Sequence, residues 1–197
     1  MIGRLTGQLA LKQPPWLLLE VGGIGYEIEA PMSTFYRLPA TGEVISLQTH
    51  LVVRDDAHLL YGFGTLAEKT LFRALIKISG VGPKVALAVL SSISADDFWN
   101  AVRAGESGRL TKTPGIGKKT AERIVVEMRD RSDTSVVNEG FTVSTPGTAM
   151  SPLTEARAAL EGLGYKPAEA QRLTGAVHKD DMSTDQIIRE ALKRALR

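Results

Sequence analysis

The sequence predicts an α+β multidomain protein with an N-terminal β-barrel, a central all-α segment and a C-terminal three-helix domain. Three observations lead to this prediction. Residues 1–64 carry short runs of β-branched and aromatic residues separated by Gly and Pro. Residues 65–131 change to a helical period. Residues 132–152 have no periodicity and are rich in Ser, Thr, Gly and Pro, which predicts a flexible linker before the last domain, residues 153–197.

Composition places the chain among folded proteins. Of its 197 residues, 43% are hydrophobic and 23% charged, so global disorder is not expected. The absence of cysteine excludes disulfides, thiolate metal sites and cysteine nucleophiles, and fits a reducing compartment. The first residues lack a signal-peptide layout, and no apolar run approaches the roughly 20 residues of a membrane span. We therefore expect a cytoplasmic protein.

The barrel is predicted from five candidate strands. Gly- and Pro-bearing breaks separate them, and five short strands are enough for a small closed barrel. The candidates are residues 2–12, "WLLLEV" (16–21), "YEIEA" (26–30), "EVISLQTHLVV" (43–53) and "HLLYGF" (58–63).

Helices follow from residue 65, in the one strongly basic part of the chain. "LFRALIKI" has an apolar stripe at helical spacing, Pro83 suits a first helical turn, and Ser94 suits an N-cap. "KKTAERIVVEMRDR" predicts a long helix with Ala121, Ile124, Val125 and Met128 facing inward. Residues 65–131 hold 12 basic and 7 acidic side chains, a net charge of +5 against +2 for the whole chain, which favours a polyanion as partner.

Two turns in this basic segment repeat one pattern. "SGVGPKVA" (79–86) and "TPGIGKKTA" (113–121) each contain Gly-x-Gly followed by lysine and an apolar helical run, 35 positions apart. A helix, a glycine turn and a second helix form a helix–hairpin–helix. Glycine lets a backbone approach a ligand closely, and the next helix starts with unpaired N–H groups that bind anions. The pattern therefore predicts binding to nucleic-acid phosphates, without sequence readout.

The candidate phosphate-binding residues come from both turns and the helices after them. The turns offer backbone N–H groups, the cationic side chains supply charge, and the apolar residue between each pair of glycines is expected to anchor its turn in the core. These candidates are Gly80, Val81, Gly82, Lys84, Gly115, Ile116, Gly117, Lys118, Lys119 and Arg123.

Enzymatic alternatives have less support. Lys118 stands where a Walker loop requires its second glycine, so no ATPase is expected, and the dinucleotide fingerprint lacks its third glycine. A glycosylase or lyase that uses such hairpins needs a catalytic aspartate; Asp96, Asp97 and Asp130 are the candidates, although a helix cap and a solvated helix end explain them better. The three histidines, His50, His58 and His178, lack metal-ligand spacing. No catalytic residue, cofactor or metal is predicted.

The chain as a whole resembles the RuvA family, the Holliday-junction-binding subunits of the bacterial branch-migration machine. The resemblance rests on "MIGRLTG", "VGGIGYE", "THLVVRDDAHLLYGF", "GVGPKVAL" and "TPGIGKKTAERIVVEM", and it extends over every predicted domain. The linker shows no recognisable pattern. The family's order of domains matches the order predicted here.

The resemblance implies more than the residue patterns do. It implies an OB-fold barrel, a UBA-like third domain that binds the RuvB hexameric ATPase, and a homotetramer, single or double, that holds an open four-way junction. RuvC resolvase is a further candidate partner. An acidic pin at the centre of the DNA face maps onto Asp55 and Asp56, where the family's Glu-Asp pair is Asp-Asp. Leu163 and Tyr165 fall in the part of the third domain expected to contact the motor.

Overall fold

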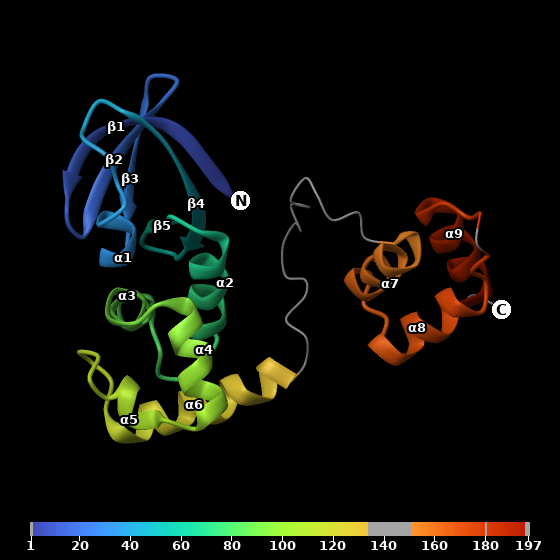
Figure 1. Cartoon of the computed structure of the whole chain (residues 1–197). Helices are drawn as coiled ribbons and strands as arrows, with labels where there is room; N and C mark the ends of the chain where they lie inside the picture. The colour runs from blue at the N-terminus through green and yellow to red at the C-terminus, as the bar shows by residue number, and fades with distance from the viewer. Residues whose placement is uncertain (1, 134–150, 180, 196–197) are drawn as a thin grey trace. The chain divides into compact units, whose positions relative to one another are not determined.

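The computed structural model describes residues 2–133, 151–179 and 181–195. It divides into two compact units, residues 1–134 and 135–197, which are treated separately below. The predicted linker, residues 132–152, lies outside the described residues except at its two ends. Figure 1 labels the elements of both units.

The first part of unit 1 is a closed five-stranded barrel in the order β1-β2-β3-β5-β4. β1 pairs with both β2 and β4, which closes the barrel, and β3 meets β5 in parallel. A short helix, α1 (Met32–Phe35), connects β3 to β4. The strands are β1 (Arg4–Gln13), β2 (Trp16–Val21), β3 (Ile24–Glu29), β4 (Val44–Val53) and β5 (His58–Phe63).

Closing the barrel brings β1 and β2 very close together at Gly7. A Cβ at Gly7 would collide with the carbonyl group of Glu20 on β2, so only glycine fits this position in β1. The register of β1 against β2 also shifts between Leu9 and Leu11, a bulge that bends the strand as a small barrel requires.

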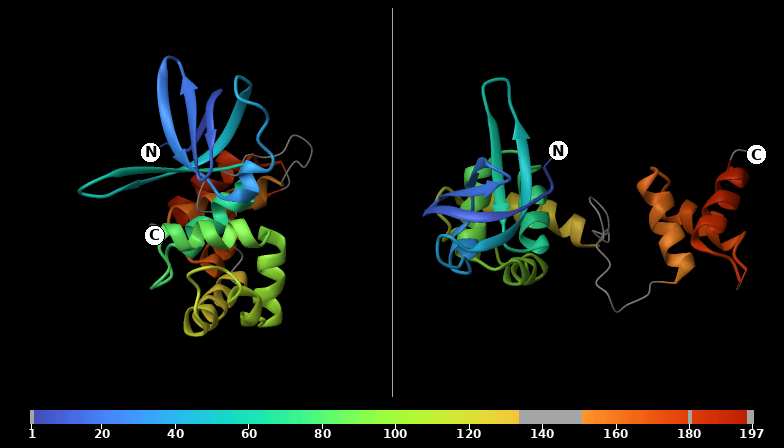
Figure 2. Two further views of the ribbon diagram at one scale, coloured as in Figure 1. Left: turned by 90° about the vertical axis from the view of Figure 1, so that its left-hand side faces the viewer. Right: turned by 90° about the horizontal axis from the view of Figure 1, so that it is seen from above.

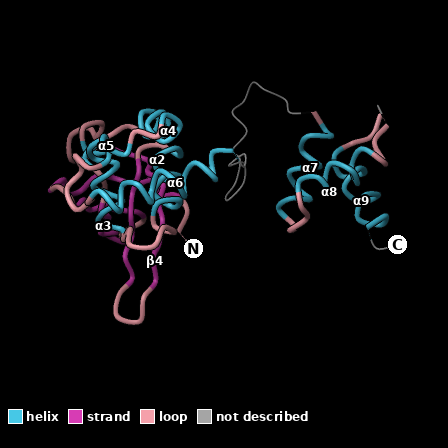
Figure 3. Tube along the Cα trace, turned by 90° about the horizontal axis from the view of Figure 1, so that it is seen from below, coloured by secondary structure: helices cyan, strands magenta, loops and turns pink. Residues whose placement is uncertain are grey.

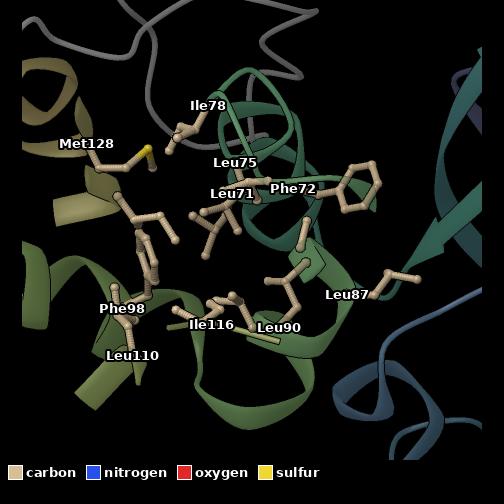
Figure 4. Packing of buried hydrophobic residues seen from close by; sticks show 14 of the residues in the cluster. Leu71, Phe72, Leu75, Ile78, Leu87, Leu90, Phe98, Leu110, Ile116 and Met128 are labelled. Atoms are coloured by element: carbon tan, nitrogen blue, oxygen red, sulfur yellow. The ribbon is translucent and has the colours of Figure 1, made fainter. Parts of the chain in front are cut away.

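The helices of unit 1 follow without a break and share a core with the barrel. Tyr61 and Phe63 of β5 are buried in one cluster with Phe72 and Leu75 of the next helix. Figure 4 shows Ile116, Leu90 and Leu110 among the packed residues of this core. The helices are α2 (Leu66–Leu75), α3 (Pro83–Ser92), α4 (Ala95–Ala104), α5 (Ser107–Leu110) and α6 (Lys118–Asp133).

Capping signals in the sequence mark the ends of these helices. Ser94 accepts a hydrogen bond from Asp97 N–H at the start of α4, and Pro83 occupies the first turn of α3, both as predicted. The inward face predicted for α6 is confirmed, since Ala121, Ile124 and Met128 are fully buried.

In its described residues, 151–179 and 181–195, unit 2 has three helices packed around a small core. They are α7 (Pro152–Gly162), α8 (Pro167–Gly175) and α9 (Thr184–Ala195). Ser151 caps α7, and Ser183 and Gln186 exchange the two hydrogen bonds of the predicted capping box at the start of α9. The barrel, the central helices and these three helices confirm the predicted fold class.

Candidate nucleic-acid interface

The two glycine turns have nearly the same backbone geometry. Gly80 and Gly115 adopt φ of +86° and +85°, in the left-handed region that favours glycine. The residue after each glycine closes the turn with equivalent hydrogen bonds, Val81 N–H to Ile78 O at 3.0 Å and Ile116 N–H to Thr113 O at 3.1 Å. The sequence repeat is therefore a structural repeat, with α2–α3 as the first hairpin and α5–α6 as the second.

Val81 and Ile116 anchor the turns, as expected, and are only 4% and 6% exposed. Their N–H groups donate inside the turns, and phosphate binding at these two residues stays a prediction. The flanking glycines are exposed, and no hydrogen bond recorded for the described residues uses the N–H of Gly80 or Gly82. The available donors of the first turn are thus its glycine amides.

Each turn leads into a helix whose first turn carries no acidic residue. Ala86 N–H to Gly82 O and Ala121 N–H to Gly117 O begin the two helical ladders, at 3.0 and 2.9 Å. Gly82 provides no side-chain cap, so the preceding N–H groups of α3 stay open to an outside acceptor. These helix starts have the positive end of the helix dipole facing outward, which favours an anion.

Exposed cations surround these helix starts. Lys84 lies in the first turn of α3, and Lys118 and Lys119 lie in the first turn of α6. Lysine is unfavourable at the positive end of a helix, so an external anion would relieve this repulsion at both hairpins. The structural repeat also pairs Lys112 with Lys77, each three residues before the first glycine. Lys112 is exposed and was not among the predicted phosphate-binding residues, although the 35-residue spacing from Lys77 indicates it.

Arg123 makes a hydrogen bond between the two hairpins. Its Nη1 donates to the carbonyl oxygen of Ser79 at 3.1 Å, so its guanidinium joins α6 of the second hairpin to the turn of the first. On the other side, a Cβ at Gly115 would lie 3.7 Å from Val85 Cγ2 of the first hairpin. The two hairpins therefore contact each other at their turns.

Glu29 of β3 adds a negative charge near Lys84. Burial raises the pKa of this carboxyl, and the nearby Lys84 ammonium partly lowers it. Both residues line an open hollow of about 410 Å³ between the barrel and α3. No spacing rule connects positions 29 and 84, so the sequence contained no signal for this pair.

Asp55 and Asp56 lie at the tip of the hairpin formed by β4 and β5. Arg54 N–H donates to Ala57 O at 2.9 Å and closes the tip, and both aspartates are exposed. Figure 2 (right) and Figure 3 show this hairpin extending well beyond the body of unit 1. Both carboxylates are thus exposed at the end of a projecting hairpin.

Of the aspartates considered for catalysis, Asp97 has a structural role in capping a helix. Asp97 accepts from Ser94 Oγ at 2.7 Å in the N-terminal turn of α4, and Asp96 is exposed in the same turn. The side chain of Asp130 lies outside the described residues. Within the described part of the chain, no three His, Asp or Glu side chains are grouped so that they could hold a metal ion.

In unit 2, the two candidate motor-contact residues differ in exposure. Leu163, at the end of α7, is 62% exposed, whereas Tyr165 is half-buried against the core formed with Leu160 and Leu173. Gly164 between them has φ of +98°, which turns the chain sharply toward α8. Among the described helices of both units, none has the length and apolarity to cross a membrane.

Comparisons with known proteins match this arrangement. Residues 1–62 match the RuvA N terminal domain, residues 72–130 the SAM-like helix-hairpin-helix tandem, and residues 151–196 the RuvA C-terminal domain. Three similar proteins each bear the name Holliday junction branch migration complex subunit RuvA. The chain is 52% identical to that of Thioalkalivibrio sulfidiphilus and to that of Escherichia coli O139:H28, over all of each chain, and 50% identical to that of Pseudomonas aeruginosa, over 98% of each chain.

Proposed function

The chain belongs to the RuvA family, and from this membership we propose that it is a non-catalytic scaffold specific for DNA structure. It binds four-way Holliday junctions, holds them open and recruits the RuvB ATPase motor for branch migration in recombination and DNA repair. The observation that carries this function is the pair of matching hairpins in the segment of net charge +5.

The hairpins grip DNA through its phosphates. In each, an exposed glycine turn, an open helix start and one or two lysines converge on one site for a phosphate oxygen. Two such sites on one rigid core engage two phosphates at a fixed spacing, as the two strands across a minor groove present them. Phosphate contacts position the protein without reading bases, which suits a junction of any sequence.

The aspartates at the tip of the β4–β5 hairpin select the shape of the DNA. In a homotetramer, four such tips near one centre repel a duplex that runs straight across, while the four arms of an open junction leave the centre. Asp55 and Asp56 thus act by excluding the wrong substrate. The tetramer, and a second tetramer on the opposite face of the junction, belong to this proposal.

Unit 2 is the docking domain for the motor. Exposed Leu163 and half-buried Tyr165, which a glycine turn presents together, form the contact surface for RuvB. RuvC resolvase is a further proposed partner, acting on the junction that the tetramer holds open. The division of the chain into two compact units supports separate binding of DNA and motor.

The test measures junction affinity against salt for Lys118→Ala. Losing one phosphate contact per site lowers affinity for all sequences alike and reduces the slope of log K against log salt by about 0.9 per contact. Lys193→Ala is the matched control, because it removes the same charge from α9, where Lys193 already pairs with Glu190. An unchanged slope for a folded Lys118→Ala protein would exclude this lysine from the interface.

The same preparation tests the enzymatic alternative. Nicked, abasic and four-way DNA are incubated with the chain alone. We expect binding without strand scission or base release, and either product would favour a glycosylase or lyase over a scaffold.

A further inference from the structure

We propose that Arg123 is a positioning residue that orients the turn of the first hairpin from the second, and so directs the N–H group of Gly80. The proposal concerns the free protein, and only its consequence for DNA binding rests on the proposed function. It assigns Arg123 a role beyond supplying charge to a phosphate.

The hydrogen bond from Arg123 crosses from one hairpin to the other. Arg123 belongs to α6, and its Nη1 lies 3.1 Å from the carbonyl oxygen of Ser79, 44 residues earlier in the chain. Its guanidinium also lies against the next residue, because a Cβ at Gly80 would be 3.9 Å from the same Nη1. Arg123 therefore contacts the turn where its backbone changes to positive φ.

Holding the Ser79 carbonyl also fixes the direction of an N–H group. The carbonyl of Ser79 and the N–H of Gly80 belong to one planar, trans peptide unit, in which they point in opposite directions. Rotation of this unit would move both groups together. By accepting a hydrogen bond from Arg123 on one side, the unit presents the Gly80 N–H on the other, where it donates to no group among the described residues.

The hydrogen bond from Arg123 to Ser79 is called the brace below. The second hairpin does not need an equivalent hydrogen bond. In the 35-residue alignment, Pro114 replaces Ser79, and Ala88 occupies the position equivalent to Arg123. The ring of Pro114 limits the backbone freedom of the second turn directly. Ser79 leaves the first turn freer, so an outside contact is required to hold it. The asymmetry of the repeat thus explains why the hydrogen bond runs in one direction only.

Arginine suits a role that joins a turn to a phosphate. A guanidinium has five N–H donors in a planar fork, so a bond to Ser79 leaves other donors for DNA. Capturing a phosphate at Arg123 and directing the Gly80 N–H are then coupled through one rigid group. Lysine, a compact point charge, keeps the attraction for phosphate but lacks the planar fork.

Amide hydrogen exchange in the free protein tests the brace without DNA. The Val81 N–H closes the first turn and the Ile116 N–H closes the second, so the ratio of their exchange rates compares the two turns within one molecule. In Arg123→Gln we expect Val81 to exchange about five- to ten-fold faster, with Ile116 unchanged. Arg123→Lys should restore only part of the protection.

Arg129→Gln is the matched control. Arg129 lies on the same helix and also donates to a backbone carbonyl, that of Arg103 at 3.2 Å, so it makes the same kind of bond to α4 instead of to the first hairpin. We expect the Val81-to-Ile116 exchange ratio in this variant to equal that of the wild type. An unchanged ratio in folded Arg123→Gln, or an equal rise in both variants, would overturn the proposal.

Junction binding then separates the brace from a plain phosphate contact. If Arg123 acts through the first hairpin, Lys84→Ala costs clearly less affinity in the Arg123→Gln background than in the wild type, whereas Lys119→Ala costs the same in both. Coupling to Lys119 alone would mean that Arg123 and Lys119 share a phosphate, and would overturn the brace. Failure of the wild type to bind junctions would instead refute the proposed function and leave the exchange result standing.

Discussion

At the scale of single residues, the backbone conformation requires glycine at one position of the second turn but not at the other. Gly115 needs a positive φ, whereas Gly117 does not, and a Cβ at Gly117 would meet no atom within 4 Å. The fold therefore tolerates a side chain at 117. A side chain at position 117 would obstruct only a ligand that approaches the backbone of this turn.

This difference makes Gly117→Val a clean probe of the interface. We expect its free energy of unfolding to stay within about 1 kcal/mol of the wild-type value, because the added Cβ would meet no atom within 4 Å. Its affinity for DNA should fall further than that of Lys118→Ala, because a branched side chain blocks the approach of a phosphate to the turn. Urea unfolding and junction titration provide the two measurements. Wild-type affinity in Gly117→Val would mean that no phosphate approaches this turn.

His50 is a half-buried titratable residue that the proposed function does not use. Its ring meets Phe72 edge-on at 5.7 Å, and its Nδ1 is buried with no hydrogen-bond partner. Burial lowers the pKa of His50, and the cations Arg73 and Lys69 of α2 lower it further. The folded protein therefore holds this imidazole neutral where β4 meets α2.

The lowered pKa of His50 predicts an acid-sensitive stability. Below about pH 6.5, the ordinary pKa of histidine, the unfolded chain binds a proton that the folded chain refuses. This contribution to stability is thus complete above pH 6.5 and is lost as the pH falls toward the folded-state pKa. As the pH is lowered from 8 to 5, the urea concentration at the midpoint of unfolding should fall less steeply for His50→Gln than for the wild type. Exposed His58→Gln is the control, and identical curves for His50→Gln and the wild type would contradict the prediction.

At the scale of elements, one buried carboxylate connects the barrel to the helices. Glu68 of α2 is 5% exposed and accepts hydrogen bonds from Ser33 Oγ of α1 at 2.7 Å and from Arg37 Nη2 at 2.6 Å. It also accepts from the N–H and the hydroxyl of Thr65, which completes a capping box at the start of α2. A helix cap and an interdomain contact thus share one side chain.

Removing this carboxylate should weaken both the cap of α2 and the contact between the barrel and the helices. We expect Glu68→Ala to lower the free energy of unfolding by about 2–4 kcal/mol, because it removes one half of the capping box and leaves the Thr65 and Ser33 donors without this acceptor. Arg37→Met should cost less than about 1 kcal/mol, since the Arg37 side chain is 53% exposed and water can replace its contacts. Denaturant titration of the two variants makes the comparison. Equal losses would show that the ion pair, and not the cap, provides the stability.

At the scale of the whole molecule, the proposed function requires attractive and repulsive charge on one compact unit. The hairpins and the β4–β5 tip both belong to residues 1–134, a single compact unit with a shared core. One carboxylate 6 Å from a phosphate in water repels it by only about 0.7 kcal/mol. Discrimination therefore requires several copies around one centre, as a tetramer supplies.

The double substitution Asp55→Asn with Asp56→Asn tests this repulsion. Affinity for plain duplex should rise while affinity for the four-way junction holds or rises slightly, so that discrimination falls. Both aspartates are exposed at a hairpin tip, and the fold should be unaffected. Paired titrations at two salt concentrations measure the effect, which high salt should reduce by screening. An unchanged junction-to-duplex ratio at low salt would make these residues an ordinary solvated turn.

The two compact units also predict separable activities. A fragment ending near Arg131 should bind junctions as the whole chain does but fail to stimulate the ATPase of the motor. A fragment starting at Ser151 should bind the motor alone, and Leu163→Ser should weaken that binding, because it removes an exposed apolar contact. Full motor stimulation by the first fragment would refute a docking role for unit 2.

Local patterns in the sequence determined the elements and the nature of the site. Strand runs, the capping signals at Ser94 and Ser183, and the Gly-x-Gly repeat depend on backbone geometry that a few neighbouring residues control. They predicted the barrel, the matching hairpins and the burial of Val81 and Ile116. The short helices α1 and α5 have four residues each, too few for a periodic signal, and were not predicted.

Tertiary packing alone decided how these parts combine. No local rule brings Arg123 to Ser79, Glu29 to Lys84 or Glu68 to Ser33, because each pair joins residues 35 or more positions apart through a core that both must share. The sequence predicted that Arg123 lies on α6, but it did not indicate that this side chain contacts the first hairpin. Directed side-chain contacts of this kind depend on the relative placement of whole elements, and only burial of their apolar faces in a common core determines that placement.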